Sequence, residues 1–380
     1  VYRDPNTNLV LVSSYDLVHE ALKRHEDFSN RFGQAMAGKA AQDEELRDVQ
    51  SEGYPNVDTM LTADPPEHKR FRGLVNKAFT PRRVDKLEPN IQKVADDLIA
   101  GFIQDGRFSV LRQFCVPLPL SVIADQLGVP SEDLPQFKRW TDGFVAQLGG
   151  MASKEEQVEA ARLIVEYQHY FAERLAEAKA APRDDIISDL VRARLEGERA
   201  LNTAESLSII QQLLVAGNET TASTIAAGLL LLIQHPDQMK LVCEDPGLLP
   251  NMIEEVTRLT TPTQNMWRVA TNDCELGDFK VNKGDFVFIR YGAANRDPAH
   301  FEDPDRFDVL RENAAEHLAY GHGIHFCIGA MLARKEMLVS FRTLLARLGD
   351  LKIADGQAIS HKPNMLLRGL QDFEIEFRAV

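Results

Sequence analysis

One cysteine lies in a segment whose composition favours a metal-binding sulfur. Cys327 follows two glycines, Gly321 and Gly323, and precedes a predicted helix that starts near Ile328. Free backbone N–H groups and the positive dipole end of a helix N-terminus stabilise a thiolate. Glycines let the backbone wrap closely around sulfur. A metal-ligating thiolate is therefore the favoured interpretation of this loop.

Two other interpretations fit the same residues. A lone cysteine is most often a free buried thiol in a turn. Zinc could use His322, His325 and Cys327, but zinc sites usually combine paired ligands from two segments, and the sequence holds no evident second pair.

A second segment places an acid and hydroxyls inside an apolar helix. Residues 216–221, Ala-Gly-Asn-Glu-Thr-Thr, lie between the apolar stretches 209–215 and 225–233. Gly, Asn and paired Thr are poor choices for a helix interior. Small residues allow a flat ligand to approach, and Glu219 beside Thr220 could relay protons. A helix kink, or hydroxyls bonded to the preceding turn, would explain the same pattern.

The cysteine loop resembles the haem-binding signature of the cytochrome P450 family, Phe-Gly-x-Gly-x-x-x-Cys-x-Gly. Tyr320 departs from the usual Phe, since it keeps the ring and adds a hydroxyl. The resemblance implies that Cys327 ligates the iron of haem b, and that Tyr320, Gly321 and Phe326 contact the cofactor. A thiolate axial ligand favours O–O cleavage.

The acid–hydroxyl segment resembles the family's oxygen-activation motif, Ala/Gly-Gly-x-Asp/Glu-Thr. This implies that Thr220 orients the oxygen species and that Glu219 assists proton delivery. Gly217 would leave room for the oxygen, and Ala216 would lie against the haem.

Haem propionates need cationic or hydrogen-bonding partners. His68 and Arg72, spaced i and i+4, share one face of a predicted helix. Residues 64–72 resemble the family's third major helix, which implies that this pair binds the propionates. Arg268 and His325 match the other usual anchors.

A scaffold motif is also similar to the family's. Glu255 and Arg258 share a helix face, which alone would indicate only an exposed ion pair of little worth. With Arg306 in the following Pro-Asp-Arg-Phe segment they resemble the Glu-Arg-Arg core triad. The resemblance implies a structural role behind the haem.

The substrate pocket is inferred by position in the family's pattern. Its apolar lining with a few amides suggests a small hydrophobic molecule with one or two polar groups, such as a terpenoid, sterol or macrocycle. Residues 33–60, polar and without clear period, are a candidate mobile loop region and would form part of a lid. The expected lining is Gln212, Val215, Ala216, Gln264, Asn265, Leu366 and Leu367.

A basic segment suggests a partner. Residues 66–83 hold six basic residues and one acid, a local charge of +5 on a chain of formal net charge −14. We expect an acidic, ferredoxin-type electron donor to dock there. No GxGxxG or flavin segment is evident, so electrons must come from another protein. The expected docking residues are Lys69, Arg70, Lys77 and Arg82.

Composition limits the other possibilities. The net charge argues against nucleic acid and against a basic membrane-surface protein. The longest apolar run, 225–233, is too short to span a bilayer. The four cysteines, scattered without a CxxC pair, favour the cytoplasm. The chain begins at Val1 without Met, as expected of a truncated sequence.

The elements that position these segments are predicted to be mostly helical. One helix begins after Asn202 or Thr203 and stops before Pro236, about 33 residues or roughly 50 Å. The expectation is a mainly α fold with small peripheral β-sheets. Helices are expected at 15–23, after a cap at Asp64, over 82–195 with breaks near Pro117, Pro130 and Pro182, at 248–260 and from 328, and strands at 9–12, 285–291 and 373–377.

The resemblance extends over the whole chain. It implies a single cytochrome P450 domain, 1–380, with a β-containing portion at about 1–60 and one long central helix over the haem. The leading function is a monooxygenase that inserts one atom of O2 into a small hydrophobic substrate. The alternatives are a peroxide-driven peroxygenase and a haem-based binder or gas sensor.

Overall fold

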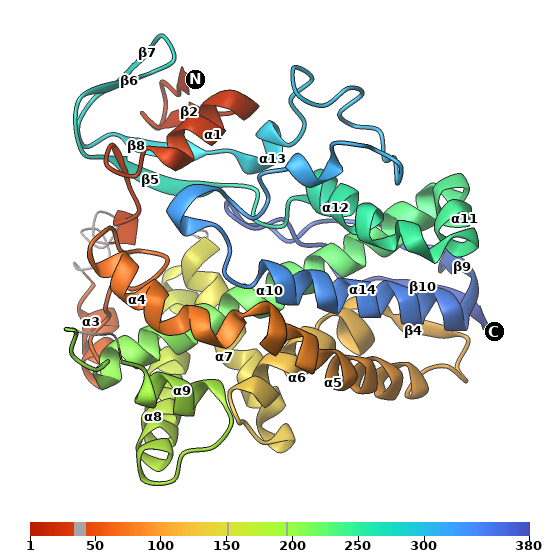
Figure 1. Cartoon of the computed structure of the whole chain (residues 1–380), viewed down its shortest axis with the longest axis horizontal. Helices are drawn as coiled ribbons and strands as arrows, with labels where there is room; N and C mark the ends of the chain where they lie inside the picture. Colours follow the sequence, from red (N-terminus) through yellow and green to blue (C-terminus); the bar gives the residue numbers. More distant parts are fainter. Residues whose placement is uncertain (34–42, 150–151, 195–196) are drawn as a thin grey trace.

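Helix α10 (Thr203–Gln234) runs through the centre of the molecule (Figure 1). The computed structural model describes residues 1–33, 43–149, 152–194 and 197–380. The Asn202 side chain accepts a hydrogen bond from the Glu205 N–H, and the Glu205 carboxylate accepts one from the Asn202 N–H. The N-terminus of α10 is therefore a capping box. The helix ends where Pro236 opens the next one. The predicted bounds of this helix are confirmed.

Other helices surround α10, so the predicted mainly α architecture is confirmed. The described residues of the stretch 82–195 are mostly helical, as expected, with strand β4 (Arg107–Ser109) and short connections between the helices. The α-helices are α1 (Tyr15–Lys23), α3 (Glu44–Ser51), α4 (Glu67–Val75), α5 (Pro81–Ala100), α6 (Pro117–Gln126), α7 (Leu134–Gly149), α8 (Lys154–Ala180), α9 (Ile186–Arg192), α11 (Pro236–Glu244), α12 (Leu249–Thr260), α13 (Tyr291–Ala294) and α14 (Ala330–Arg347).

The β-sheets are small and lie at the periphery (Figure 1). One sheet has the strand order β1-β2-β8-β5-β3, with β2 and β8 parallel. A second has the order β4-β10-β9, and β6 pairs with β7. The remaining strands are β1 (Tyr2–Arg3), β2 (Val10–Val12), β3 (Phe28–Ser29), β5 (Met266–Ala270), β6 (Cys274–Leu276), β7 (Phe279–Val281), β8 (Phe286–Ile289), β9 (Leu348–Ile353) and β10 (Glu374–Ala379).

Two hydrophobic cores meet at α10, which explains why this helix is apolar on most of its circumference. Ile225 belongs to the core that includes Phe341 of α14, whereas Ile210 belongs to the core that includes Trp140 of α7. A side chain at Gly228 would bring its Cβ within 2.5 Å of the Phe341 ring. Glycine therefore permits the close approach of α10 and α14.

Three expectations about elements are corrected. Asp64 does not cap α4, because its carboxylate accepts from the Ser29 hydroxyl and the Asn30 N–H. Within the expected lid, residues 44–51 form α3, capped by Asp43, while 34–42 lie outside the described residues. The last helix begins at Ala330.

Within the described ranges, none of the helices combines the length and apolar character that a membrane crossing would need.

Candidate active site

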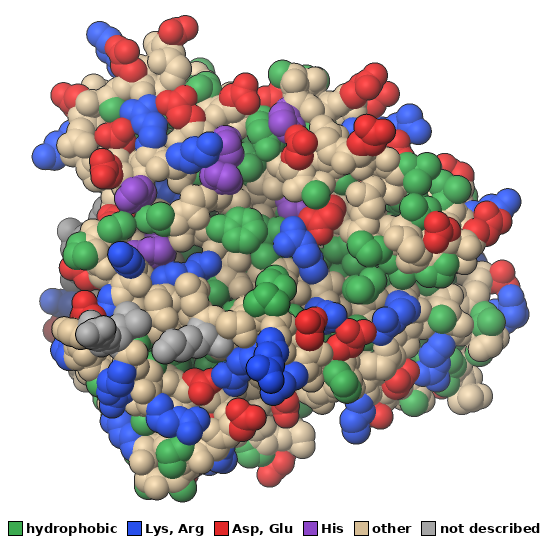
Figure 2. Space-filling view, viewed as in Figure 1, with side chains coloured by type: hydrophobic (Ala, Val, Ile, Leu, Met, Phe, Trp, Pro, Cys, Tyr) green, Lys and Arg blue, Asp and Glu red, His purple; other side chains and the backbone are tan. Residues whose placement is uncertain are grey.

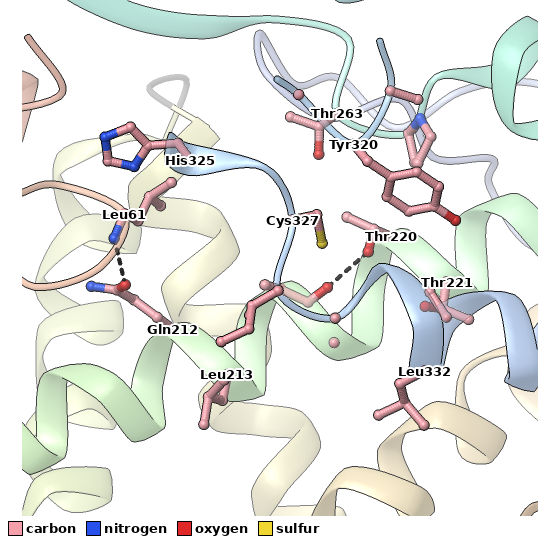
Figure 3. Close-up of a pocket in the computed structure, with 18 of the residues that line it drawn as sticks. Leu61, Gln212, Leu213, Thr220, Thr221, Thr263, Tyr320, His325, Cys327 and Leu332 are labelled. Carbon is pink, nitrogen blue, oxygen red and sulfur yellow. Dashed lines mark hydrogen bonds between the residues drawn. The ribbon is translucent and has the colours of Figure 1, made fainter. Parts of the chain in front are cut away.

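The cysteine loop is folded back on itself before α14. Gly321 and Gly323 have φ values of 70° and 69°, which other residues rarely adopt. A Cβ on Gly323 would come within 2.7 Å of the Leu22 carbonyl oxygen. The Cys327 N–H donates to the Tyr320 carbonyl at 2.9 Å. This geometry directs the sulfur into a cavity (Figure 3).

This inner cavity, of about 250 Å³, separates the cysteine loop from the middle of α10. Cys327 lies on one wall and Thr220 on the other, and both point toward the space between (Figure 3). Ala216 and Gly217 also line it, and a Cβ on Gly217 would have only Ile123 Cγ1, at 4.0 Å, as a neighbour. The small residues therefore leave open space beside α10.

Thr220 and Glu219 face different sides of α10. The Thr220 hydroxyl donates to the Ala216 carbonyl at 2.8 Å, the bond to the preceding turn that is one explanation of the sequence pattern. Glu219 is 7% exposed, lines neither described cavity, and accepts from Lys362 Nζ at 3.0 Å. The hydroxyl thus faces the cavity and the carboxylate faces the segment that carries Lys362.

Burial dominates the protonation of the cysteine. It raises the pKa of the Cys327 thiol above its ordinary value, although the Gly329 N–H, Arg72 and Arg334 oppose this. The helix N-terminus alone therefore does not make a thiolate here. A bound metal cation would, because a coordinating thiol is deprotonated outright.

The rim of the inner cavity has donors that lack an anion. Arg268 is 4% exposed, and its guanidinium donates to the Trp267 carbonyl at 2.7 Å. His325 lines this cavity, and His68, which lines neither described cavity, lies beside it with the two ring centres 4.3 Å apart. Their buried Nε2 atoms have no hydrogen-bonding partner in the described part of the chain. Burial, and then Arg268, lowers the pKa of His325 to about 2. Arg72 also lines this cavity.

Buried donors without acceptors are costly unless a ligand completes them. A planar cofactor that brings two carboxylates, as haem does, fits this rim, and the cavity offers a sulfur for its metal. The residues present therefore fit haem.

Residues 148–375 match the family model described as Cytochrome P450. The chain belongs to the cytochrome P450 family. Cytochrome P450 107B1 of Saccharopolyspora erythraea is 39% identical over 318 residues, covering 83% of this chain and 76% of that protein. A steroid C26-monooxygenase of Mycobacterium tuberculosis is 35% identical over 378 residues, covering 99% and 96%. The structure of cytochrome P450 CYP109Q5 from Chondromyces apiculatus has a TM-score of 0.86 at 37% identity, covering 98% and 90%.

The resemblance seen in the sequence is thereby confirmed, together with the enzyme class. This cytochrome P450 is a haem-thiolate monooxygenase, an oxidoreductase that uses O2.

The scaffold triad of this P450 differs from the expected one. Glu255 and Arg258 are fully buried and joined at 2.7 Å. The third member is Arg311, whose Nε lies 3.1 Å from Glu255 Oε1. The expectation for Arg306 is wrong, since its side chain is 63% exposed and lies 3.6 Å from Asp308. Its backbone carbonyl points inward instead and accepts from Arg258 and Arg311.

An outer cavity of about 1100 Å³ adjoins the inner one, because six residues line both. Val215, Leu366 and Leu367 line the outer cavity, as the sequence predicts. The six shared residues are Leu61, Gln212, Ala216, Thr220, Thr263 and Met266.

For two residues, the expectation that they line the substrate pocket is wrong. Gln264 and Asn265 line neither described cavity. Their amides donate to the carbonyls of Asn364 and Met365 at 3.4 Å and 2.7 Å, so they join the segment before β5 to the C-terminal loops. Their neighbours Thr263 and Met266 line the cavities instead.

Two ionisable groups near the site escaped the sequence reasoning. Glu336 is 2% exposed, lines the inner cavity, and has its pKa raised by burial to about 8. Arg334 lies 4.4 Å from the Tyr320 ring centre and makes two bonds to Glu254, at 2.7 and 2.8 Å. The available signal was their place on the helix that follows Cys327.

The expected docking residues separate into two groups. Lys69 and Arg82 are exposed and make no ion pair with any described residue. Arg70 is engaged, since it pairs with Glu205 at 3.0 Å and with Glu198 at 3.3 Å. The Lys77 side chain lies outside the described residues.

Phe326, expected against the haem, is 42% exposed, and its carbonyl accepts from Arg72 at 2.6 Å.

Proposed function

We propose that Cys327 holds the iron of haem b and that Arg72, Arg268, His68 and His325 bind its propionates. One observation carries this proposal: the Cys327 sulfur and the Thr220 hydroxyl face each other across a cavity rimmed by donors without anions. When bound, haem supplies the iron centre at which O2 is reduced and split.

The chain's own residues orient the reactants and move protons. The Thr220 hydroxyl donates a hydrogen bond to the Ala216 carbonyl, which leaves the lone pairs of the hydroxyl oxygen free to accept a hydrogen bond inside the cavity. Gly217 leaves the space that O2 needs. We place Glu219, held by Lys362, at the proton supply from the opposite side of α10. Two protons and two electrons enter per turnover, and the second oxygen atom leaves as water.

The substrate proposal follows from the outer cavity. Its volume, about 1100 Å³, lies at the upper end of ligand pockets. Phe32, Phe71 and Phe144 give it apolar walls, while Gln147 and Gln211 offer neutral amides. We propose a hydrophobic molecule with a few neutral polar groups, of sterol or macrocycle size. The name of the relative that acts as a steroid C26-monooxygenase supports this class.

We propose that a ferredoxin-type electron donor docks at Lys69 and Arg82. We also propose that the chain folds as a single domain and acts in the cytoplasm. Figure 2 shows basic side chains over the band of α4 and α5, interspersed with hydrophobic and acidic ones. Phe326 and Met331 are each 42% exposed beside the cysteine loop and would supply apolar contact.

The test is the carbon monoxide spectrum of the reduced, haem-loaded protein. A band at the wavelength diagnostic of thiolate ligation is expected, and Cys327→Ser should remove it while haem content persists. Folded protein that lacks the band, or a Cys327→Ser variant that keeps it, would contradict the proposal. Turnover that needs a ferredoxin and NAD(P)H separates the monooxygenase from a peroxygenase, and any turnover excludes a simple sensor.

A further inference from the structure

Gln212 is bonded to a separate segment of the chain, residues 57–61. Its Oε1 accepts from the Leu61 N–H at 2.9 Å, a bond drawn in Figure 3. Its Nε2 donates to Thr59 Oγ1 at 2.7 Å. Both ends of the amide are therefore occupied by the protein. Gln212 thus lines both cavities, as the sequence predicts, while its amide is bonded to the protein.

A second side chain of α10 completes the attachment. Ser208, one turn before Gln212, donates to the Val57 carbonyl at 2.7 Å and lies 2.9 Å from Thr59 Oγ1. Thr59 is fully buried, so its hydroxyl depends on these partners. We call Thr59, Ser208 and Gln212 the clasp. Residues i and i+4 share a helix face, which is why Ser208 and Gln212 can bond the same segment.

The clasp lies where the two cavities meet. Leu61 and Gln212 line both cavities, whereas Val57 and Ser208 line only the outer one. The segment that the clasp holds is thus a wall of the passage between the entrance space and the Cys327–Thr220 space.

We propose that the clasp fixes the width of this passage, and that Gln212 acts as a positioning residue that sets which substrates reach Thr220. The proposal rests on the function proposed above. Loss of the Gln212 amide would leave the Leu61 N–H and the Thr59 hydroxyl without this partner, so the segment would open more readily. Larger molecules would then pass, without any change in the residues around the sulfur.

The experiment compares Gln212→Met with Gln211→Met in the haem-loaded protein. Gln211 carries the adjacent amide on α10 and lines the outer cavity, and its side chain makes no hydrogen bond within the described ranges. Amide hydrogen exchange of the peptide covering 57–62 is measured in the substrate-free protein. We expect at least roughly tenfold faster exchange in Gln212→Met, since about 1.4 kcal/mol of local stability corresponds to tenfold, and no change in Gln211→Met.

A second measurement follows the binding rate of imidazole and of a bulky phenylimidazole to the haem. The bulky ligand should bind several-fold faster in Gln212→Met, and imidazole should not. Unchanged exchange, or equal acceleration by Gln211→Met, overturns the proposal. If Gln212→Met fails to fold, Ser208→Ala removes the bond to Val57 and is measured in the same way. The carbon monoxide band, retained in these variants, separates failure of this proposal from failure of the haem assignment.

Discussion

Lys362 Nζ lies 3.0 Å from Glu219 Oε1, so the acid next to Thr220 is held from outside the cavity. Lys362 lies on a C-terminal loop. Its backbone N–H donates to the Gly369 carbonyl at 2.9 Å. The Lys362 side chain is 40% exposed and that of Glu219 is 9% exposed. The pair therefore connects a nearly buried carboxylate to solvent.

We predict that Lys362→Met uncouples the enzyme. Without the Lys362 ammonium, the Glu219 carboxylate loses the partner that fixes its position. Product formed per NAD(P)H should fall several-fold while hydrogen peroxide release rises, as measured with a saturating redox partner. Lys352→Met, which breaks the pair with Glu376 on an exposed sheet, is the control and should leave coupling unchanged. Equal coupling in both variants would remove Lys362 from the proton supply.

Arg311 and Arg306 give opposite predictions for stability. Arg311→Leu removes one partner of a fully buried carboxylate, which typically costs about 3–5 kcal/mol. Arg306→Leu changes an exposed side chain, so the effect should stay within about 0.5 kcal/mol. Urea unfolding of the two variants, with haem content recorded, decides between them. The opposite ranking would restore Arg306 as the third member of the triad.

Glu336 predicts a pH-dependent stability. Its pKa is about 8 in the folded protein and near 4.5 when exposed, so between these values the folded state binds a proton that the unfolded state lacks. Stability is therefore lost as pH rises from about 5 to 8. Glu336→Gln should remove this loss. Its free energy of unfolding should exceed that of the unchanged protein by on the order of 4 kcal/mol at pH 8 and by little at pH 5.

The measurement for Glu336 is the urea midpoint at several pH values. Exposed Glu132→Gln is the control and should follow the unchanged protein at every pH. An advantage of Glu336→Gln that does not grow with pH would show that the carboxyl is already ionised in the fold.

Charge reversal should locate the docking surface. Lys69→Glu with Arg82→Glu should slow reduction by an acidic ferredoxin at least several-fold and flatten its salt dependence. Lys280→Glu with Lys283→Glu, on β7 and in the turn after it, carries the same charge change on another part of the surface. Stopped-flow reduction at two ionic strengths tests this. Equal slowing by this double control would indicate a net-charge effect without a defined dock.

The sequence alone determined the features that depend on local spacing. The glycines around Cys327 and the small residues beside Thr220 require particular backbone shapes whatever the rest of the chain does. The capping box at Asn202 and the stop at Pro236 likewise set the ends of α10 locally. These patterns were sufficient for the family, the fold class and the position of the candidate sulfur.

Only the tertiary structure decided the pairings between distant segments. Arg311, and not Arg306, is the third member of the triad. At residue 306 the backbone carbonyl, and not the side chain, points toward Arg258. Gln212 became a positioning residue because residues 57–61 lie against α10. A side chain's role follows from which of its possible partners it meets, and that depends on packing across the chain, which local patterns do not encode.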